Sequence, residues 1–345
     1  MNILVTGGAG YIGSHVVKEL LTSGNDILVL DNFSTGHREA LDILQGLPEV
    51  TQGKRKLKAT YGDTGDRTVL AGLLQEESIS AIIHLAAFSQ VGESMQNPGK
   101  YFNNNVARAI NILECMALTG VKHIVFSSTA AVYGEPLEIP IPETHPTAPT
   151  NVYGASKQMV EDLLKWYGRT YDIKYISLRY FNAAGADASG LIGEHHEPET
   201  HLIPIVMQRI LGQRDELFIY GNDYPTDDGT CVRDYVHVTD LAQAHNLALT
   251  ALADGIDSRI YNLGNGNGYS VKEVIDMVAD VVGKTIPYTI GERRPGDPAV
   301  LVASADKIRN ELGWKPVYSS LKDIVSTAWE WHKRYPSGYN LKCEK

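Results

Sequence analysis

The stretch TGGAGYIGSHVV, residues 6–17, limits the possible folds of this chain more than any other feature. A short apolar run, Ile3–Val5, precedes the glycines, and apolar residues at helical spacing follow them as far as Ser23-Gly24-Asn25. A second apolar segment, DILVLD at 26–31, completes a strand-helix-strand unit of about thirty residues. Glycines at a strand-to-helix turn are typical of loops whose free N–H groups hold a pyrophosphate. The sequence therefore predicts an N-terminal dinucleotide-binding unit.

The glycines fit two registers. Gly8, Gly10 and Gly13 spell G-x-G-x-x-G, whereas Gly7, Gly10 and Gly13 spell G-x-x-G-x-x-G, and the loop by itself leaves both open. Asp31 ends the second strand, 18 residues after Gly13. A carboxylate there accepts hydrogen bonds from the adenosine ribose and repels a 2′-phosphate, so we expect NAD rather than NADP as the cofactor.

Strand-like and helix-like segments continue to alternate after this unit. We expect strands over 56–63, 81–87, 123–128 and 173–180, with helices over 68–77, 100–118 and 152–171. This alternation predicts an α/β fold, a doubly wound parallel sheet of the Rossmann type with helices on both faces.

The pattern changes after residue 180. Long loops rich in Gly, Pro, His and Asp cover 182–204 and 221–234, and helical patterns return at 240–253, 271–282 and 321–333. Long polar loops usually serve binding. We therefore predict an NAD-binding Rossmann domain over 1–180, with returning segments near 235–263, and a smaller C-terminal α/β substrate-binding lobe over 181–345, interleaved with the core.

Composition excludes several classes of partner. The chain of 345 residues has a net charge of -10 and no basic tract, which argues against nucleic acid. It has no signal peptide and no apolar run of about 18 residues, which argues against a membrane. Cys115, Cys231 and Cys343 are widely spaced, so we expect reduced thiols and a cytoplasmic location.

Tyr153 and Lys157 carry the predicted chemistry. Four residues apart on an expected helix, they lie one turn from each other. A phenol has an ordinary pKa of about 10, and a fixed positive charge lowers it. Lys157 and a bound oxidised nicotinamide can supply such charges, so Tyr153 can act as a base toward an alcohol. Hydroxyl residues at 127–129 end the preceding strand and can face that alcohol.

These motifs together resemble the extended short-chain dehydrogenase/reductase family. The resemblance rests on TGGAGYIG, Asp31-Asn32, Gly62-Asp63, HLAA at 84–87, SSTAAVYG at 127–134, YGASK at 153–157 and RYFNAAG at 179–185. Within the family the chain is similar almost end to end to the UDP-hexose 4-epimerases, most specifically over 221–235, and RRPGD at 293–297 adds to the match. That family uses the register of Gly7, Gly10 and Gly13.

The resemblance implies a set of site residues. Catalysis would involve Tyr153, Lys157 and Thr129. NAD would contact Gly7, Gly10, Tyr11, Ile12, Gly13, Asp31, Asn32, Asp63, Leu85, Ala86, Ala87, Asn104, Ser127, Tyr153, Lys157 and Tyr180. The UDP-sugar substrate would contact Thr129, Asn182, His201, Leu202, Tyr220, Arg233, Arg294, Asp297 and Leu301. Guanidinium groups suit phosphate oxygens, which independently supports the two arginines.

The resemblance also implies a reaction and an assembly. Tyr153, assisted by Thr129, would take the proton of the sugar 4-hydroxyl while NAD oxidises C4. The 4-keto sugar would turn and be reduced on its other face, which interconverts UDP-glucose and UDP-galactose. Relatives form homodimers through the segments 100–118 and 152–171, packed as a four-helix bundle.

Departures from the family pattern affect the expected specificity. Thr129 stands where serine is common, Ser89 where some members have lysine, and His201-Leu202 replaces Asn-Leu. Leu301 occupies a position that is bulky in glucose-specific members and smaller in those that accept N-acetyl sugars. Because leucine is intermediate in size, the UDP-N-acetylhexosamine pair is a second expected substrate.

Other interpretations are open. A nucleotide-sugar 4,6-dehydratase shares the loop and the Tyr-Lys pair but has carboxylates where this chain has Ala130-Ala131. A UDP-glucuronate decarboxylase lacks the segment at 221–226, and a catalytically inactive NAD-sensing regulator typically loses the Tyr-Lys pair. His195, His196 and His201 lack the spacing of common zinc sites, so we expect no metal. We expect His84 to be a packed core histidine.

Overall fold

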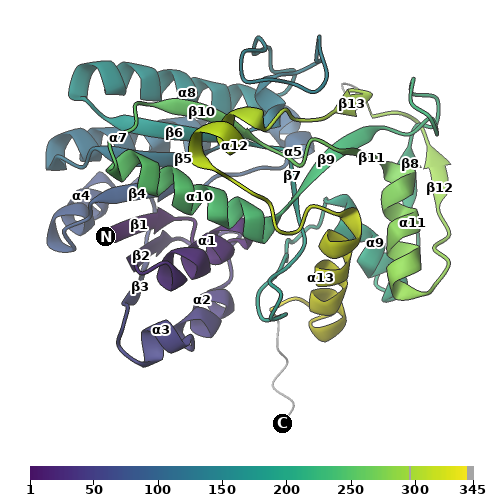
Figure 1. Cartoon of the computed structure of the whole chain (residues 1–345), viewed down its shortest axis with the longest axis horizontal. Helices are drawn as coiled ribbons and strands as arrows, with labels where there is room; N and C mark the ends of the chain where they lie inside the picture. Colours follow the sequence, from purple (N-terminus) through teal and green to yellow (C-terminus); the bar gives the residue numbers. More distant parts are fainter. Residues whose placement is uncertain (295–296, 340–345) are drawn as a thin grey trace.

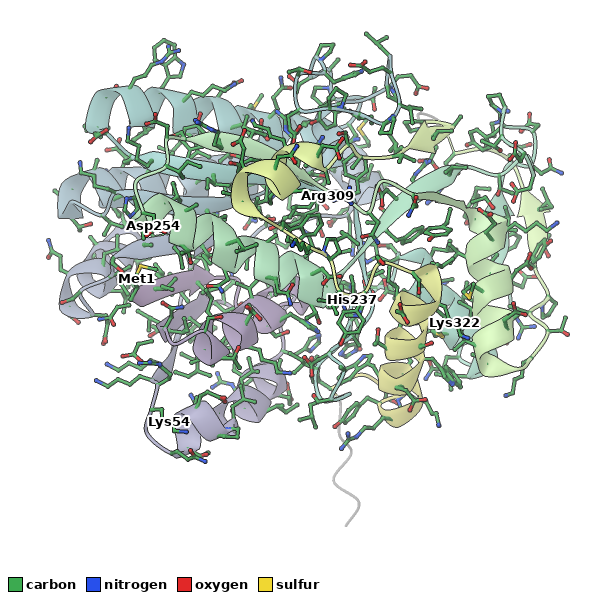
Figure 2. The ribbon with its side chains drawn as sticks, viewed as in Figure 1. Met1, Lys54, His237, Asp254, Arg309 and Lys322 are labelled. Carbon is green, nitrogen blue, oxygen red and sulfur yellow. The ribbon has the colours of Figure 1, made fainter. Side chains whose placement is uncertain are left out.

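A computed structural model describes residues 1–294 and 297–339. Figure 1 shows a large sheet covered by helices beside a smaller lobe that carries β8, β9, β11, β12 and β13. The chain crosses between the two parts more than once. Figure 2 labels His237 near their junction, where it ends β9 (Val232–His237) and caps α10 (Val238–Ala253).

The large sheet has seven parallel strands in the order β10-β6-β5-β4-β1-β2-β3. Their bounds are β1 Asn2–Thr6, β2 Asp26–Asp31, β3 Leu57–Tyr61, β4 Ala81–His84, β5 His123–Thr129, β6 Lys174–Tyr180 and β10 Arg259–Leu263. The predicted α/β class and doubly wound sheet are confirmed. The strand order reverses between β1 and β4, so loops leaving their carboxyl ends diverge and leave room for a ligand.

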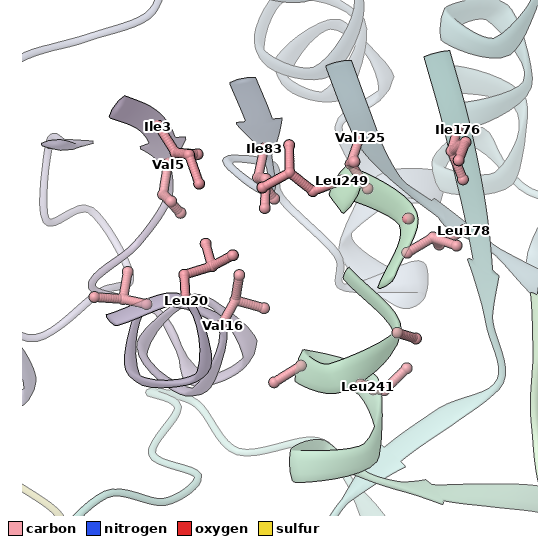
Figure 3. Packing of buried hydrophobic residues seen from close by; sticks show 14 of the residues in the cluster. Ile3, Val5, Val16, Leu20, Ile83, Val125, Ile176, Leu178, Leu241 and Leu249 are labelled. Carbon is pink, nitrogen blue, oxygen red and sulfur yellow. The ribbon is translucent and has the colours of Figure 1, made fainter. Parts of the chain in front are cut away.

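Helices cover both faces of this sheet. One face carries α1 (Tyr11–Thr22), α2 (Arg38–Gln45), α3 (Pro48–Thr51), α10 and α12 (Asp306–Leu312), and the other carries α4 (Arg67–Glu76), α7 (Arg108–Thr119) and α8 (Val152–Tyr171). Figure 3 shows the first face, where Ile3 and Val5 of β1 contact Val16 and Leu20 of α1. Strands buried on both faces need the continuous apolar runs seen in the sequence.

The smaller lobe has two sheets of its own. β7 (Asn182–Ala184), β9, β11 (Gly268–Ser270) and β13 (Val300–Leu301) form one, and β8 (Phe218–Tyr220) pairs with β12 (Thr289–Gly291) in the other. They pack with α9 (Leu202–Ile210), α11 (Val271–Val282) and α13 (Leu321–Arg334). Because β7 follows β6 almost directly and pairs with β9, the lobe lies against the carboxyl edge of the large sheet.

The helix predicted over 100–118 is present, but it contains a π-helical segment that the sequence did not indicate. After α5 (Val91–Gln96), the segment divides into α6 (Pro98–Tyr101), a π-helix η1 (Phe102–Ala107) and α7. Asn105 in the π-helix donates a hydrogen bond to the Phe88 carbonyl and accepts one from its N–H, both at 3.0 Å. Such tertiary bonds favour a wider turn, and π-turns often occur at functional sites.

Two further findings concern the predicted environment of the chain. Cys115 and Cys231 are buried free thiols, and Cys343 lies outside the described residues. Over 1–294 and 297–339, no helix has both the length and the apolar character that crossing a membrane requires.

Candidate active site

The glycine loop requires glycine at two positions. Gly7 has a φ of +75°, and a Cβ atom built on it would lie 2.6 Å from the Ala86 nitrogen. A Cβ on Gly13 would lie 2.0 Å from the Gly7 carbonyl oxygen. Gly8 instead allows close packing on the Val29 side chain. The loop geometry therefore favours the register of Gly7, Gly10 and Gly13.

Gly10 caps α1 without a side chain, so the first helical N–H groups stay available to an anion. Asp31 lies beside this loop. Its carboxylate accepts a hydrogen bond of 2.9 Å from the Ala9 N–H and one of 2.8 Å from the Phe33 N–H. Burial raises the pKa of Asp31, and these two hydrogen bonds oppose the rise. The carboxylate is thus held in place at the end of β2.

A chain of polar contacts connects the predicted adenosine and nicotinamide positions. Asn32 donates to Asp63 at 2.9 Å, and Arg108 lies 2.8 Å from the same carboxylate oxygen. Arg108 also donates to the Asn104 side chain at 2.6 Å. Sequence reasoning missed Arg108, although its spacing of four residues from Asn104 on a helical segment could have indicated it.

The HLAA segment closes the other side of the loop. The Leu85 and Ala86 N–H groups donate to the Thr6 carbonyl oxygen at 3.0 and 3.1 Å, which explains the close approach of this backbone to Gly7. His84 is packed, as expected, with its Nδ1 atom 2.7 Å from the Thr6 hydroxyl. The segment 84–87 is therefore fixed at the point where the strand order reverses.

Tyr153 and Lys157 lie in the first turns of α8. The Lys157 Nζ atom is 6.0 Å from the centre of the Tyr153 ring. Burial lowers the pKa of Lys157 to about 7, and burial raises the pKa of Tyr153 to about 12 despite a hydrogen bond with Thr129. Desolvation therefore dominates the pKa of the phenol in the protein alone, and a lowering of this pKa by Lys157 and a bound oxidised nicotinamide stays a prediction.

The strand ends next to this pair supply two further hydroxyl groups. Thr129 ends β5 and faces Tyr180 at the end of β6, and the Thr129 Oγ1 atom accepts a hydrogen bond of 3.1 Å from the Ala131 N–H. Burial raises the pKa of Tyr180, whose hydroxyl makes a short hydrogen bond to His245. Ser127 offers its carbonyl oxygen to Lys157. No local pattern indicated His245, which comes from α10.

Five of the predicted substrate residues lie together in the smaller lobe. Asp297 is 3.3 Å from Arg233 through one carboxylate oxygen and 3.3 Å from Arg294 through the other. The Arg294 guanidinium lies 4.8 Å from the centre of the exposed Tyr220 ring. Leu301 pairs in register with Arg233. Pro295 and Gly296 of the RRPGD motif lie outside the described residues.

The remaining predicted site residues lie in different parts of the structure. Asn182 is exposed at the start of β7, and Leu202 begins α9. The Tyr11 hydroxyl donates to the Gly185 carbonyl at 2.7 Å and is therefore committed to a bond within the protein. His201 occupies the N-cap position of α9 without a side-chain capping bond, and its Nδ1 atom lies 2.5 Å from a Glu194 oxygen, a partner that the sequence did not indicate. Ile12 packs on the core beneath the glycine loop.

This architecture, with a glycine loop at the first turn and a Tyr-Lys pair at the carboxyl edge, defines the class of extended short-chain dehydrogenases/reductases. A family model described as GDP-mannose 4,6 dehydratase matches residues 4–327. The UDP-glucose 4-epimerase of Lacticaseibacillus casei is 50% identical over 339 residues, which cover 98% of this chain and 99% of that protein. The chain belongs to the UDP-glucose 4-epimerase family.

Solved structures agree with this assignment. One UDP-glucose 4-epimerase crystal structure is 48% identical with a TM-score of 0.92, covering 99% of this chain and 100% of that chain. The UDP-glucose 4-epimerase of Bifidobacterium longum in complex with NAD+ and UDP is 40% identical with a TM-score of 0.90, covering 98% of this chain and 100% of that chain.

Proposed function

We propose that this chain is an NAD-dependent epimerase that interconverts UDP-glucose and UDP-galactose by transient oxidation at sugar C4. The observation that carries the proposal is the position of Tyr153, Lys157 and Thr129 at the carboxyl edge of a dinucleotide-binding sheet. The names of relatives that match it almost end to end support the same reaction.

The residues present fit NAD. A Cβ atom at Gly7 or Gly13 would collide with backbone atoms, so the loop keeps the room and the N–H groups that a pyrophosphate needs. Asp31 suits a ribose diol and disfavours a 2′-phosphate. When bound there, NAD supplies the redox chemistry by taking a hydride from sugar C4 and returning it. The residues proposed to hold it are those named in the sequence analysis, with Arg108 as a support for Asn104 and Asp63.

The protein would handle the proton. Tyr153 takes the proton of the sugar 4-hydroxyl and later gives it back, and Thr129 orients that hydroxyl through the hydrogen bond it shares with Tyr153. With the phenol pKa at about 12 in the protein alone, the phenolate needs a further positive charge nearby. A bound oxidised nicotinamide would supply such a charge. The Lys157 ammonium would be a second positive group and would contact the ribose of the cofactor.

The smaller lobe would hold the nucleotide while the sugar turns. Arg233 and Arg294 share one carboxylate and are positioned to exchange it for diphosphate oxygens, and Tyr220 and Asp297 lie beside them for the uridine. If the protein binds only the UDP part of the intermediate tightly, the 4-keto sugar can rotate about its phosphate linkage. Reduction on the other face of the sugar would then invert C4.

The dehydratase reading is not favoured, although the family model carries that description. Expelling water across C5 and C6 needs an added acid and base, and η2 (Ala130–Val132) provides methyl and isopropyl groups instead of carboxylates. A regulator without activity would not need a proton carrier such as Tyr153 or the buried Lys157 next to it. Leu301 packs against the cluster that contains Ala130, so we propose the UDP-N-acetylhexosamine pair as a second, slower substrate pair.

We also propose that the domains divide near residue 180, with α10 and β10 returning to the first domain, and that the protein is cytoplasmic.

We propose further that the protein is a homodimer. The dimer is supported by apolar side chains on α7 and α8 that are exposed in the single chain, Ile110, Leu118, Met159 and Trp166. Acidic composition gives no support to a nucleic-acid partner.

The test is to incubate the purified protein with UDP-galactose and no added cofactor and to identify products by NMR. We expect UDP-glucose, formed with NAD that copurifies with the protein. A stable 4-keto-6-deoxy sugar would move the assignment to a dehydratase. No reaction even with added NAD would contradict the proposal. UDP-N-acetylglucosamine at millimolar concentration tests the second substrate pair.

A further inference from the structure

The loop between β7 and α9 brings four metal-ligating side chains together. Glu194, His196, Glu199 and His201 each place one ligand atom within a group whose members all lie within 4.8 Å of one another. Sequence reasoning considered only the histidines of this loop. The spacing Glu-x-His-x-x-Glu-x-His becomes informative once the loop folds, because Glu194 and Glu199 turn inward between the two imidazoles.

The distances around His196 fit a shared ion better than a hydrogen bond. Its Nδ1 atom lies 3.4 Å from a Glu194 oxygen and 3.4 Å from a Glu199 oxygen, and it has no hydrogen-bond partner among the described residues although it is shielded from solvent. Ordinary N–H···O bonds span about 2.7–3.2 Å. Two ligands about 2.0–2.1 Å from a tetrahedral ion are about 3.3–3.4 Å apart. The separations at His196 match the second geometry.

The cluster also holds two buried negative charges that need a balancing positive charge. The Glu194 and Glu199 side chains are only 4% and 2% exposed. Within the described residues, no lysine or arginine lies within ion-pair distance of either carboxylate. The histidines are their charged partners, and Glu199 also accepts hydrogen bonds from the Thr200 and His201 N–H groups. Buried carboxylates are costly unless they are paired or coordinate a metal. Either protons on both histidines or a divalent ion would balance the two negative charges.

We propose that Glu194, His196, Glu199 and His201 bind one Zn²⁺ ion in a four-ligand structural site. Two imidazole nitrogens and two carboxylate oxygens form a ligand set that zinc accepts, and four protein ligands leave no open position for catalysis. His201 Nδ1 is 2.5 Å from a Glu194 oxygen and must move away on binding; its half-exposed side chain has the freedom to do so. A cavity of about 230 Å³ lined by Glu194, His196 and Glu199 gives an ion access.

Such an ion would connect the loop that supplies its ligands with two other parts of the molecule, the glycine loop and α9. The His196 ring meets the Tyr11 ring edge-on at 6.1 Å, next to the glycine loop. His201 directly precedes α9 in the smaller lobe. The ion would thus hold in place the loop that connects the glycine loop with the smaller lobe. His201 would then be a metal ligand rather than a substrate contact. This inference is independent of the proposed function, because it predicts binding of zinc by the chain itself.

The experiment uses untagged, full-length protein treated with a chelator and titrated with ZnCl₂ by calorimetry and with CoCl₂ by visible absorption. We expect one equivalent of either metal per chain, with the intense d–d absorption of tetrahedral Co²⁺. His196→Gln should weaken zinc binding by more than about a hundredfold, since loss of even an outer-sphere partner costs about 10–100-fold.

His195→Gln is the matched control. His195 is the neighbouring histidine, stacks on His37 at 4.2 Å and lies outside the cluster, so its replacement should leave zinc binding unchanged. Glu199→Gln is the second ligand variant if His196→Gln does not fold. No saturable binding by the wild-type protein, a weak octahedral Co²⁺ spectrum, or equal loss in His195→Gln would each overturn the proposal in favour of a proton-balanced cluster.

Discussion

The Lys157 ammonium donates a hydrogen bond of 2.7 Å to the backbone carbonyl of Ser127. This contact joins the second turn of α8 to the end of β5. It fixes the helix that carries Tyr153 at the carboxyl edge of the sheet, where ligands of α/β folds bind. The same burial that makes the contact strong lowers the pKa of Lys157 to about 7.

Replacement of Tyr153 by phenylalanine should remove the proton carrier and leave the ring in place. We expect kcat for UDP-galactose to fall by at least about 10²–10⁴-fold, the usual contribution of a general base, with an unchanged melting temperature. Tyr171→Phe, at the exposed end of the same helix, is the control and should be fully active. A Tyr153→Phe enzyme within tenfold of wild type would contradict the role.

Gly13→Ala should abolish retention of NAD. Its Cβ would lie 2.0 Å from the Gly7 carbonyl oxygen, so the loop must open to admit it. The measurement is the NAD content of the purified protein after acid release. Gly72→Ala in α4 meets nothing closer than 4.0 Å and should instead stabilise the protein by about 0.5–1 kcal/mol. Full NAD content in Gly13→Ala would refute the assigned loop.

Arg233→Met should raise the KM for UDP-galactose by about 10–100-fold, because a charge-assisted hydrogen bond contributes about 1.5–3 kcal/mol. NAD content should not change, since Arg233 lies in the smaller lobe. Arg293→Met is matched in chemistry, but Arg293 pairs with Asp223 rather than with Asp297. Equal effects of the two substitutions on KM would show that the loss is only one of surface charge.

Acid should destabilise the chain through its buried neutral histidines. Burial lowers the pKa of His84 and His237 to about 3 and that of His15 and His245 to about 4. Their stabilising effect is complete above the unfolded pKa of about 6.5 and is lost as the pH falls toward 4, because only the unfolded chain then binds the protons. Each contributes up to about 1.4 kcal/mol per pH unit.

Urea unfolding at pH 7.5, 6.5 and 5.5 measures this loss. The free energy of unfolding should decrease steeply only over the lower interval, and His84→Asn should remove about one proton from the slope. An equal slope in the wild type and in His84→Asn would show that His84 is not neutral in the folded protein.

Trp166→Glu should convert a dimer into a monomer. Trp166 on α8 is 64% exposed in the single chain. Two further large apolar side chains, Met159 on the same helix and Leu118 on α7, are also exposed. A charge introduced into such an apolar face opposes burial. Light scattering after gel filtration gives the mass. Val317→Glu, at a 65% exposed valine away from both helices, should leave the mass unchanged. A wild-type monomer would exclude the proposed assembly.

Local sequence patterns determined the strands and helices of the fold and the kinds of residue that make up the candidate active site. Apolar runs define the buried strands, and helix α8 has the same bounds as predicted, Val152–Tyr171. The glycine spacing, Asp31 and the Tyr-Lys pair could be read directly because each depends on neighbours within one turn or one unit of the chain. The π-helix at Phe102–Ala107 could not, because Asn105 reaches Phe88 across a loop.

Tertiary structure decided which groups meet. Asp297 joins Arg233, 64 residues earlier in the chain, and the Tyr180 hydroxyl meets His245 from α10. It also raises the pKa of Tyr153 in the protein alone, since desolvation depends on everything packed around the phenol. Glu194 and Glu199 are ordinary loop residues in the sequence. Only folding buries them against the imidazoles, and burial is what makes a charged group require a partner.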